Sequence, residues 1–112
     1  MRVAYADPPY LGCGKKHYGK RHPQAGEWDN PERHRQLILE LGEYDAWAMS
    51  LSSPSLSTIL PMCPEDCRVM AWVKPFAVYK PNVGVCYAWE PVIVSGGRKR
   101  TRKQLTVKDF VS

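Results

Sequence analysis

The chain has 112 residues, 44% hydrophobic and 24% charged, which limits it to one domain with the composition of a soluble globular protein. Its apolar runs fall well short of the ~20 residues that a membrane-spanning helix needs. The N-terminus lacks the charged-then-apolar pattern of a secretory signal, so we expect a cytoplasmic protein with no membrane partner. The net charge of +5 and the pI of about 9.1 favour a partner that carries phosphates.

The first predicted element is a short buried strand over residues 3–6, which leads into the corner Asp7-Pro8-Pro9-Tyr10. Prolines fix φ and lack an N–H, so the carbonyls at this corner are free to accept hydrogen bonds from a ligand. Asp7 adds a carboxylate acceptor, and Tyr10 offers a flat face on which a planar base could stack. An exocyclic amine such as adenine N6 has two N–H donors and needs two acceptors. The plainer interpretation is a proline-rich turn in which Asp7 is a cap.

A polar loop from residue 11 to about residue 28 follows the corner, and its length favours a functional role. It contains a basic group that would suit phosphates: Lys15, Lys16, Lys20 and Arg21. A helix comes next, capped by Asp29 or Asn30 and ended by Gly42. His34 falls on the apolar face of this helix, and we interpret it as a helix-face residue rather than a catalytic one.

Strands and one more helix alternate over the rest of the chain. The predicted elements are a strand over 44–51, a short helix over 55–60, a strand over 68–73 closed by Lys74-Pro75-Phe76, a strand over 85–94 and a turn at Ser95-Gly96-Gly97. This order predicts an α/β fold with a mainly parallel sheet, in which the last strand enters as an antiparallel hairpin. We assign residues 1–94 to the domain and 95–112 to a basic turn and tail.

The tail carries a second basic group: Arg98, Lys99, Arg100, Arg102, Lys103 and Lys108. We expect Arg98 and Arg100, together with the basic group of the first loop, to contact nucleic-acid phosphates. Lys74, at a strand end, is a weaker candidate for a phosphate or cofactor contact. The plainer interpretation of all these residues is a solvated surface.

The cysteines give little support for a metal site. Cys63 and Cys67 have a loose zinc-type spacing, but no second pair follows and the histidines do not complete a site. We therefore expect no metal, and reduced, mostly buried thiols.

Asp-Pro-Pro-Tyr after a hydrophobic strand resembles the catalytic signature of the S-adenosylmethionine-dependent amino-methyltransferases, chiefly the N6-adenine DNA methyltransferases. In that family a helix, a strand, a helix, a strand and an antiparallel strand follow the corner, an order similar to the one predicted for this chain. Trp72-Val73-Lys74-Pro75 is similar to a segment after a late strand of the family. The stretch 87–94, with Glu90, more loosely resembles a His-Glu-aliphatic-aliphatic segment. The resemblance implies part of a Rossmann-like methyltransferase sheet and a bacterial or phage origin.

The resemblance also implies a role for each residue of the corner. The catalytic roles fall on Asp7, Pro8, Pro9 and Tyr10. The Asp7 carboxylate and the Pro8 carbonyl would hold the target amine while it loses a proton. They would orient its lone pair at the methyl group of S-adenosylmethionine, which makes Asp7 a cofactor contact as well. Tyr10 would stack on an adenine that is flipped out of the DNA duplex.

One part of the family pattern is missing. The family binds its methyl donor mainly through another half of the fold, with a Phe-x-Gly-x-Gly-like loop whose glycines admit the cofactor. Here Gly12-Cys13-Gly14 precedes no helix, and Gly96-Gly97 runs into basic residues. We therefore expect the catalytic and target half alone, either as a truncated product or acting with a second polypeptide or a second copy that supplies the cofactor half. Whether the chain by itself is an enzyme stays open.

Three alternatives to N6-adenine methylation of DNA also stay open. The first is N4-cytosine methylation, where the corner often has Ser in place of Asp, so Asp7 favours adenine. The second is an RNA adenine target. The third is a non-catalytic nucleic-acid-binding remnant that uses the basic groups and the aromatic residues Trp72 and Trp89.

Overall fold

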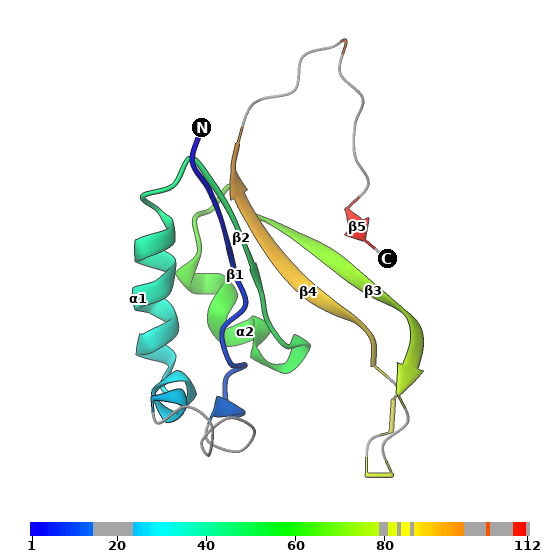
Figure 1. The fold of residues 1–112 in the computed structure, drawn as a ribbon. Coiled ribbons are helices and arrows are strands. Elements are labelled where there is room, and N and C mark those ends of the chain that lie inside the picture. Colours follow the sequence, from blue (N-terminus) through cyan, green and yellow to red (C-terminus); the bar gives the residue numbers. More distant parts are fainter. Residues whose placement is uncertain are drawn as a thin grey trace.

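The computed structural model describes residues 1–14, 24–78, 81–82, 84–85, 87–97, 103 and 109–111. Its strands are β1 (Val3–Ala6), β2 (Ala46–Ser50), β3 (Arg68–Val78), β4 (Tyr87–Gly96) and β5 (Phe110–Val111). Its helices are α1 (Pro31–Leu41), the short α2 (Leu56–Ile59) and the 3-10 turns η2 (Ala25–Asp29), η3 (Ser53–Ser55) and η4 (Leu60–Met62) (Figure 1). This mixture confirms the α/β class. None of the described helices has the length and apolar composition to cross a bilayer.

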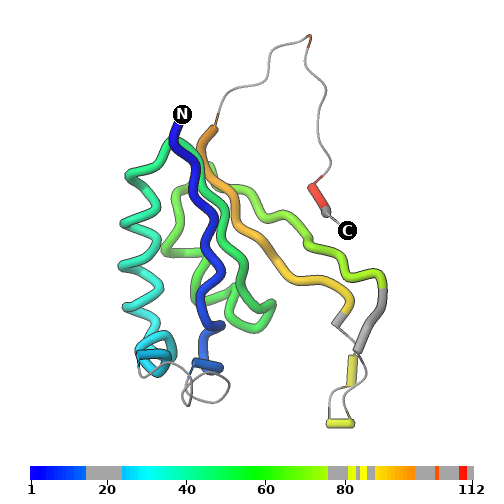
Figure 2. The backbone as a smooth tube through the Cα atoms, in the orientation of Figure 1, coloured from blue at the N-terminus to red at the C-terminus, as the bar shows by residue number. Residues whose placement is uncertain are grey.

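The sheet has the strand order β1-β2-β4-β3-β5. β1 pairs with β2 and β3 pairs with β5 in parallel, whereas β4 lies between β2 and β3 and is antiparallel to both. β1, β2 and β3 thus run in one direction and β4 runs back between them (Figure 2). The antiparallel hairpin strand is confirmed. The mainly parallel sheet is wrong, because the inserted β4 replaces a direct β2–β3 pairing by two antiparallel ones.

Two predicted strand boundaries are also wrong. Pro75 does not close β3, which continues to Val78, but the β3–β4 register shifts between Val73 and Val78. A proline cannot donate to the ladder, so the strand passes it only with an irregularity. The predicted glycine turn begins later than expected, because β4 runs on to Gly96, which has a φ of 76°.

Helix α1 begins as its sequence predicts. Asn30 is the N-cap, because its side-chain oxygen accepts from the N–H of Glu32 at 3.0 Å. Asp29, the other candidate, accepts instead from the N–H of Gly14 at 2.8 Å and ties the start of the first loop to η2. Gly42 ends the helix in a right-handed conformation, and His34 lies on the buried side of α1 as predicted.

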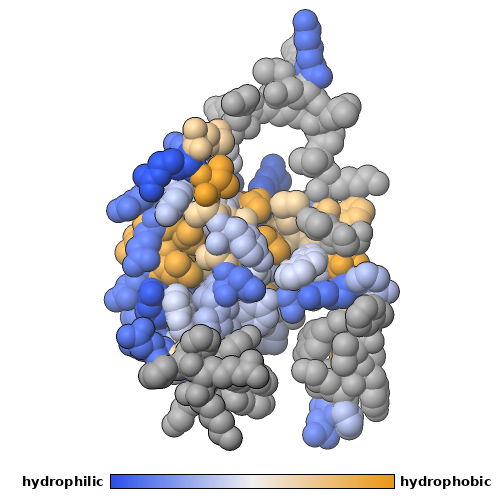
Figure 3. Space-filling model, in the orientation of Figure 1, coloured by the Kyte–Doolittle hydropathy of each residue, from blue (hydrophilic) through white to orange (hydrophobic). Residues whose placement is uncertain are grey.

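The core lies between the two helices and one face of the sheet. Its buried side chains are Ile38 and Leu41 of α1, Ile59 of α2, Trp47 and Met49 of β2, Leu51 directly after β2, and Ile93 of β4. Ala4 and Ala6 pack against this core, so the alternate residues of β1, Val3 and Tyr5, point to the opposite face and are 65% and 60% exposed. No described helix covers that face. Hydrophobic residues show over the strands in Figure 3, beside the mostly hydrophilic outer side of α1.

Candidate functional site

The Asp7 corner lies at the carboxyl end of β1, beside the carboxyl end of β2. Because these strands are parallel, their ends meet at one edge of the sheet, which is where α/β sheets commonly bind ligands. Ser50, the last residue of β2, is fully buried, and its Oγ donates to Oδ1 of Asp7 at 3.2 Å. The phenol of Tyr5 lies 2.5 Å from the same Oγ, and it is the donor there because the Ser50 proton already goes to Asp7. Residues from two strands therefore hold the Asp7 carboxylate in place.

The acceptors predicted at this corner remain available. Asp7 is exposed, and within the described part of the chain no group donates to its Oδ2 or to the Pro8 carbonyl. The Tyr10 carbonyl, in contrast, accepts from the N–H of Cys13 at 2.8 Å and closes a turn directly after the corner. Pro8 and Pro9 are half-buried, which fixes the path of the backbone. The corner thus presents a carboxylate oxygen and a carbonyl oxygen for a donor such as an amine.

Tyr10 is anchored at the far end of its ring. Its phenol donates to Oε2 of Glu90 on β4 at 2.6 Å. Burial raises the pKa of Tyr10 above its ordinary value, and the hydrogen bond and negative charge of Glu90 raise it further. The phenol is therefore a protonated donor at neutral pH. Asp7 and Tyr5 also contribute to the raised pKa of Tyr10, so all three side chains share one electrostatic environment.

Lys74 approaches the same carboxylate oxygen of Glu90. Its ammonium is 4.0 Å from Oε2 of Glu90 and 3.9 Å from the centre of the Trp72 ring. Trp72 and Glu90 are themselves cross-strand partners on β3 and β4. The structure therefore brings Lys74, predicted as a weak phosphate or cofactor candidate, to the same site as the corner. Its charge is partly matched there by the Glu90 carboxylate and the face of the indole.

The other predicted nucleic-acid contacts lie outside the described residues: Lys15, Lys16, Lys20, Arg21, Arg98 and Arg100. Sequence reasoning does not single out Tyr5 and Ser50, and it includes Glu90 only in a loosely similar segment. Ser50 had one usable signal, because it is a polar residue at the end of the strand that follows the corner strand. Tyr5 had another, since it lies two residues before Asp7 and therefore on the same side of the strand.

The described parts of the chain contain no cluster of three or more His, Cys, Asp or Glu side chains that could hold a metal ion. Cys13, Cys63 and Cys67 are free thiols. Burial, with a smaller contribution from Cys67, raises the pKa of the Cys63 thiol to about 11, and its Sγ lies 3.5 Å from the Ile59 carbonyl. Cys63 is therefore a protonated packing residue beside the core.

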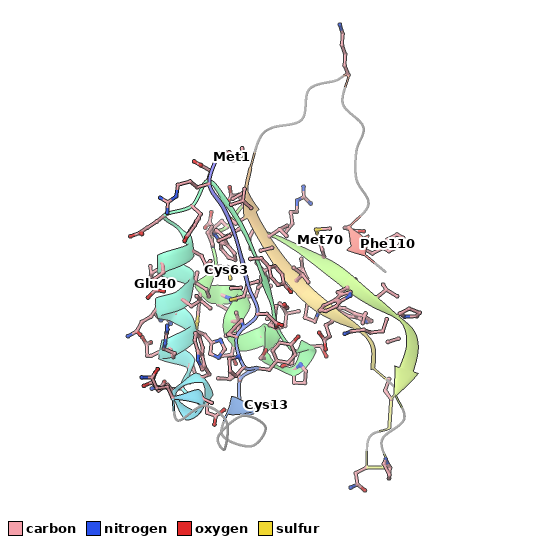
Figure 4. All side chains as sticks on the ribbon, viewed as in Figure 1. Met1, Cys13, Glu40, Cys63, Met70 and Phe110 are labelled. Carbon is pink, nitrogen blue, oxygen red and sulfur yellow. The ribbon has the colours of Figure 1, made fainter. Side chains whose placement is uncertain are left out.

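The two described surface grooves lie away from the corner. One, of about 660 Å³, is lined by Cys67, Arg68, Val69, Met70, Val94, Asp109 and Phe110. The other, of about 520 Å³, lies along α2 and is lined by Ser53, Leu56, Ser57, Leu60 and Pro61. Figure 4 shows Met70 and Phe110 at the first groove, whereas Cys13, just after the corner, lies at the other end of the sheet. Neither of these two grooves includes Asp7 or Tyr10.

The described glycines do not fit a binding loop for S-adenosylmethionine. A Cβ on Gly14 would come within 2.1 Å of the Ala25 carbonyl oxygen, so this glycine permits a backbone contact inside the protein. A Cβ on Gly96 would likewise come within 2.3 Å of the Asp45 carbonyl oxygen. A Cβ on Gly12 would meet nothing within 4 Å, but Gly12 lies in the turn after the corner and not between a strand and a helix. These positions serve packing and turns rather than a cradle for a cofactor.

Comparison with known proteins adds no relative: no protein-family model matches the chain, and no curated protein sequence matches it significantly.

Proposed function

We propose that this chain is the catalytic and target half of an S-adenosylmethionine-dependent N6-adenine DNA methyltransferase. The observation that carries the proposal is the Asp7 corner at the carboxyl end of β1, with its carboxylate held by Ser50 and its tyrosine held by Glu90. A proline-rich turn with a capping aspartate would not need either contact. Asp7 does not cap α1, because Asn30 has that role.

The sheet supports the finer part of the proposal, a fragment of a Rossmann-like methyltransferase fold. β1, β2 and β3 run in the same direction, α1 and the α2 segment connect them, and the last long strand, β4, is antiparallel. This is the succession of elements that the family resemblance implies after the corner. Helices α1 and α2 lie on one face of the sheet, and the corner lies at the carboxyl ends of the parallel strands β1 and β2.

The residues of the chain would act on the acceptor base. A flipped adenine would place its two N6 hydrogens on the free Asp7 oxygen and the Pro8 carbonyl, and its ring on Tyr10. Holding the nitrogen in one orientation lowers the barrier chiefly through alignment. The carboxylate of Asp7 also stabilises the positive charge that the amine acquires before it loses a proton. An aspartate here, with a full carboxylate acceptor, favours adenine over cytosine.

The methyl group would come from S-adenosylmethionine, but the glycines that the structure describes do not fit a site for it. We therefore propose that a second polypeptide or a second copy of this chain supplies the cofactor half. The exposed edge of β1 is where a further strand could join the sheet, because β1 has a paired neighbour on one side only among the described strands.

The proposal is tested by incubating the purified chain with labelled S-adenosylmethionine and unmethylated DNA, with and without lysate of the source cells, and assaying N6-methyladenine by mass spectrometry. Asp7→Ala should abolish the product in either mixture, whereas the exposed loop variant Asp66→Ala should leave it unchanged. Product formation at the wild-type rate by Asp7→Ala would overturn the assignment.

A salt series of DNA binding distinguishes the non-catalytic alternative. Binding that weakens steeply with salt and is indifferent to S-adenosylmethionine and to Asp7→Ala would identify a nucleic-acid-binding remnant. Binding that Asp7→Ala weakens more than Asp66→Ala does, at every salt concentration, would support a working acceptor site.

A further inference from the structure

Glu90 is the polar side chain that joins the far strand of the hairpin to the corner. It lies 80 residues from Tyr10 in sequence, and the two meet only because β4 folds back between β2 and β3. Its backbone is fixed in the sheet opposite Trp72, and its carboxylate is half-buried between the Tyr10 phenol and the Lys74 ammonium. It is therefore a rigid acceptor on a regular strand, facing a residue that lies on a loop.

Tyr10 needs such an anchor if its ring is to act as a platform. It follows two prolines that fix the backbone but not its own side-chain torsions, and it lies outside any regular element. A hydrogen bond at the phenol, the atom farthest from the backbone, restricts both torsions at once. The edge of the ring is then occupied by Glu90, while its faces stay free of hydrogen bonds. A ring held by its edge keeps one orientation for a base that stacks on its face.

We propose that Glu90 is a positioning residue, which acts through Tyr10 by fixing the ring in the orientation that stacks on the target base. This inference rests on the proposed function for its ligand, a flipped or single-stranded adenine. It assigns to Glu90 no contact with the base and no proton transfer. Lys74, whose ammonium lies 4.0 Å from the same Oε2 of Glu90, has the same indirect role.

The first experiment needs no ligand. Tetranitromethane nitrates tyrosines through the phenolate, so a phenol that donates to a carboxylate is protected. Peptide mapping by mass spectrometry should show that Tyr10 is nitrated more slowly than Tyr44 in the wild-type chain. Glu90→Ala should expose Tyr10 to nitration, whereas Glu40→Ala, which removes an exposed acid from the outer side of α1 (Figure 4), should not. Equal nitration of Tyr10 in the wild-type and Glu90→Ala chains would overturn the inference.

The second experiment measures stacking. A single-stranded oligonucleotide with one 2-aminopurine among adenines should lose fluorescence when the full chain binds it and its base stacks on Tyr10. Tyr10→Phe keeps the ring but removes the hydroxyl that donates to Glu90. Glu90→Ala removes the carboxylate that accepts the same hydrogen bond. Each variant should raise the dissociation constant of the quenched complex about fivefold, which corresponds to the loss of one hydrogen bond. Tyr10→Phe is compared with the wild-type chain, and Glu90→Ala is compared with Glu40→Ala. Glu40→Ala corrects for the general gain in phosphate affinity when a negative charge is removed.

The double variant Tyr10→Phe/Glu90→Ala decides between positioning and mere structural support. If Glu90 acts through the Tyr10 phenol, the double variant should bind no more weakly than either single variant. Glu90→Gln, whose amide oxygen still accepts, should restore most of the quenching. Additive losses, or no rescue by Glu90→Gln, would overturn the inference while leaving the proposed function intact. Absence of quenching by the wild-type chain, with Tyr10 still protected from nitration, would overturn the proposed function and with it the stacking role of Glu90.

Discussion

Each side chain of the corner depends on a partner from another strand. Ser50 fixes Asp7 and Glu90 fixes Tyr10, and both bonds cross from the corner after β1 to strands that come much later in the chain. A carboxylate that keeps one oxygen bound and one free is oriented without losing its capacity to accept from a ligand. At this scale the two side chains that would touch a base, Asp7 and Tyr10, are each held by a residue that would not.

His34 provides a prediction about pH that concerns stability rather than the site. It is buried at the start of α1, where its Nε2 lies 2.7 Å from the Trp28 carbonyl and its ring meets the edge of Trp28. Burial lowers the pKa of His34, although the bond to the Trp28 carbonyl opposes this, and the charge of Arg33 lowers it further while that of Asp29 raises it. In the folded chain the imidazole therefore resists protonation more than in the unfolded chain.

The sign of the effect follows from this difference. As pH falls below about 6.5, the unfolded chain takes up a proton at His34 before the folded chain does, so the free energy of unfolding decreases. We expect urea titrations to show that the stability difference between the wild-type chain and His34→Gln is constant above pH 7.5 and shrinks below pH ~6.5. The carboxylates titrate in both chains, so their contribution to the pH dependence cancels in the stability difference. A difference that stays constant down to pH ~5 would contradict the lowered pKa of His34.

At the scale of elements, the join between β2 and β4 depends on a glycine. Gly96 ends β4 opposite Ala46, with a φ of 76°, and a Cβ there would lie 2.3 Å from the Asp45 carbonyl oxygen. The same carbonyl accepts from the N–H of Gly97 at 3.0 Å, and the Asp45 carboxylate accepts from the N–H of Arg2 at 2.6 Å. The starts of β1 and β2 and the end of β4 are therefore held together at this one place.

We predict that Gly96→Ala lowers the free energy of unfolding by at least about 2 kcal/mol, because it adds a left-handed strain and a backbone clash. Gly84→Ala is the matched control, since a Cβ at Gly84 meets nothing within 4 Å, and it should change stability by less than about 0.5 kcal/mol. Chemical denaturation of both variants measures the difference. Equal stability of the two would show that the end of β4 is not packed as the structure has it.

At the scale of the whole molecule, the helices that the structure describes lie on one face of the sheet. In the described part of the chain the other face and the β1 edge expose Val3 and Tyr5, and Phe110 is 46% exposed at the far strand. Such a surface favours association with another sheet or another copy. We therefore predict that the isolated chain is weakly stable or self-associates.

The corresponding measurement is analytical ultracentrifugation across a range of protein concentration. We expect concentration-dependent association, which Val3→Lys should weaken because it places a charge at the β1 edge. Leu39→Lys is the matched control, since Leu39 is 70% exposed on the outer side of α1, away from the sheet. A monomer at all concentrations with a sharp, cooperative thermal transition would contradict the expectation.

Several elements could be predicted from the sequence because their signals are local. The corner prolines, the cap at Asn30, the helical period of α1 and the apolar run of β1 each lie within a few residues of the feature that they specify. Strand ends were harder to predict. A proline such as Pro75 commonly ends a strand, yet β3 continues past it because pairing with β4 resumes at Val78. The sequence singles out Asp7 and Tyr10, but not Ser50, and it includes Glu90 only in a loosely similar segment.

The sequence by itself therefore determined the α/β class, the antiparallel hairpin strand and the position of the Asp-Pro-Pro-Tyr corner at the end of the first strand. Only the tertiary structure decided that β4 lies between β2 and β3, and hence that Ser50 reaches Asp7 and Glu90 reaches Tyr10. The physical reason is that turns, caps and amphipathic periods are properties of short stretches. Strand order and the contacts of residues 43 and 80 positions apart depend on which packing of the whole sheet buries the core best.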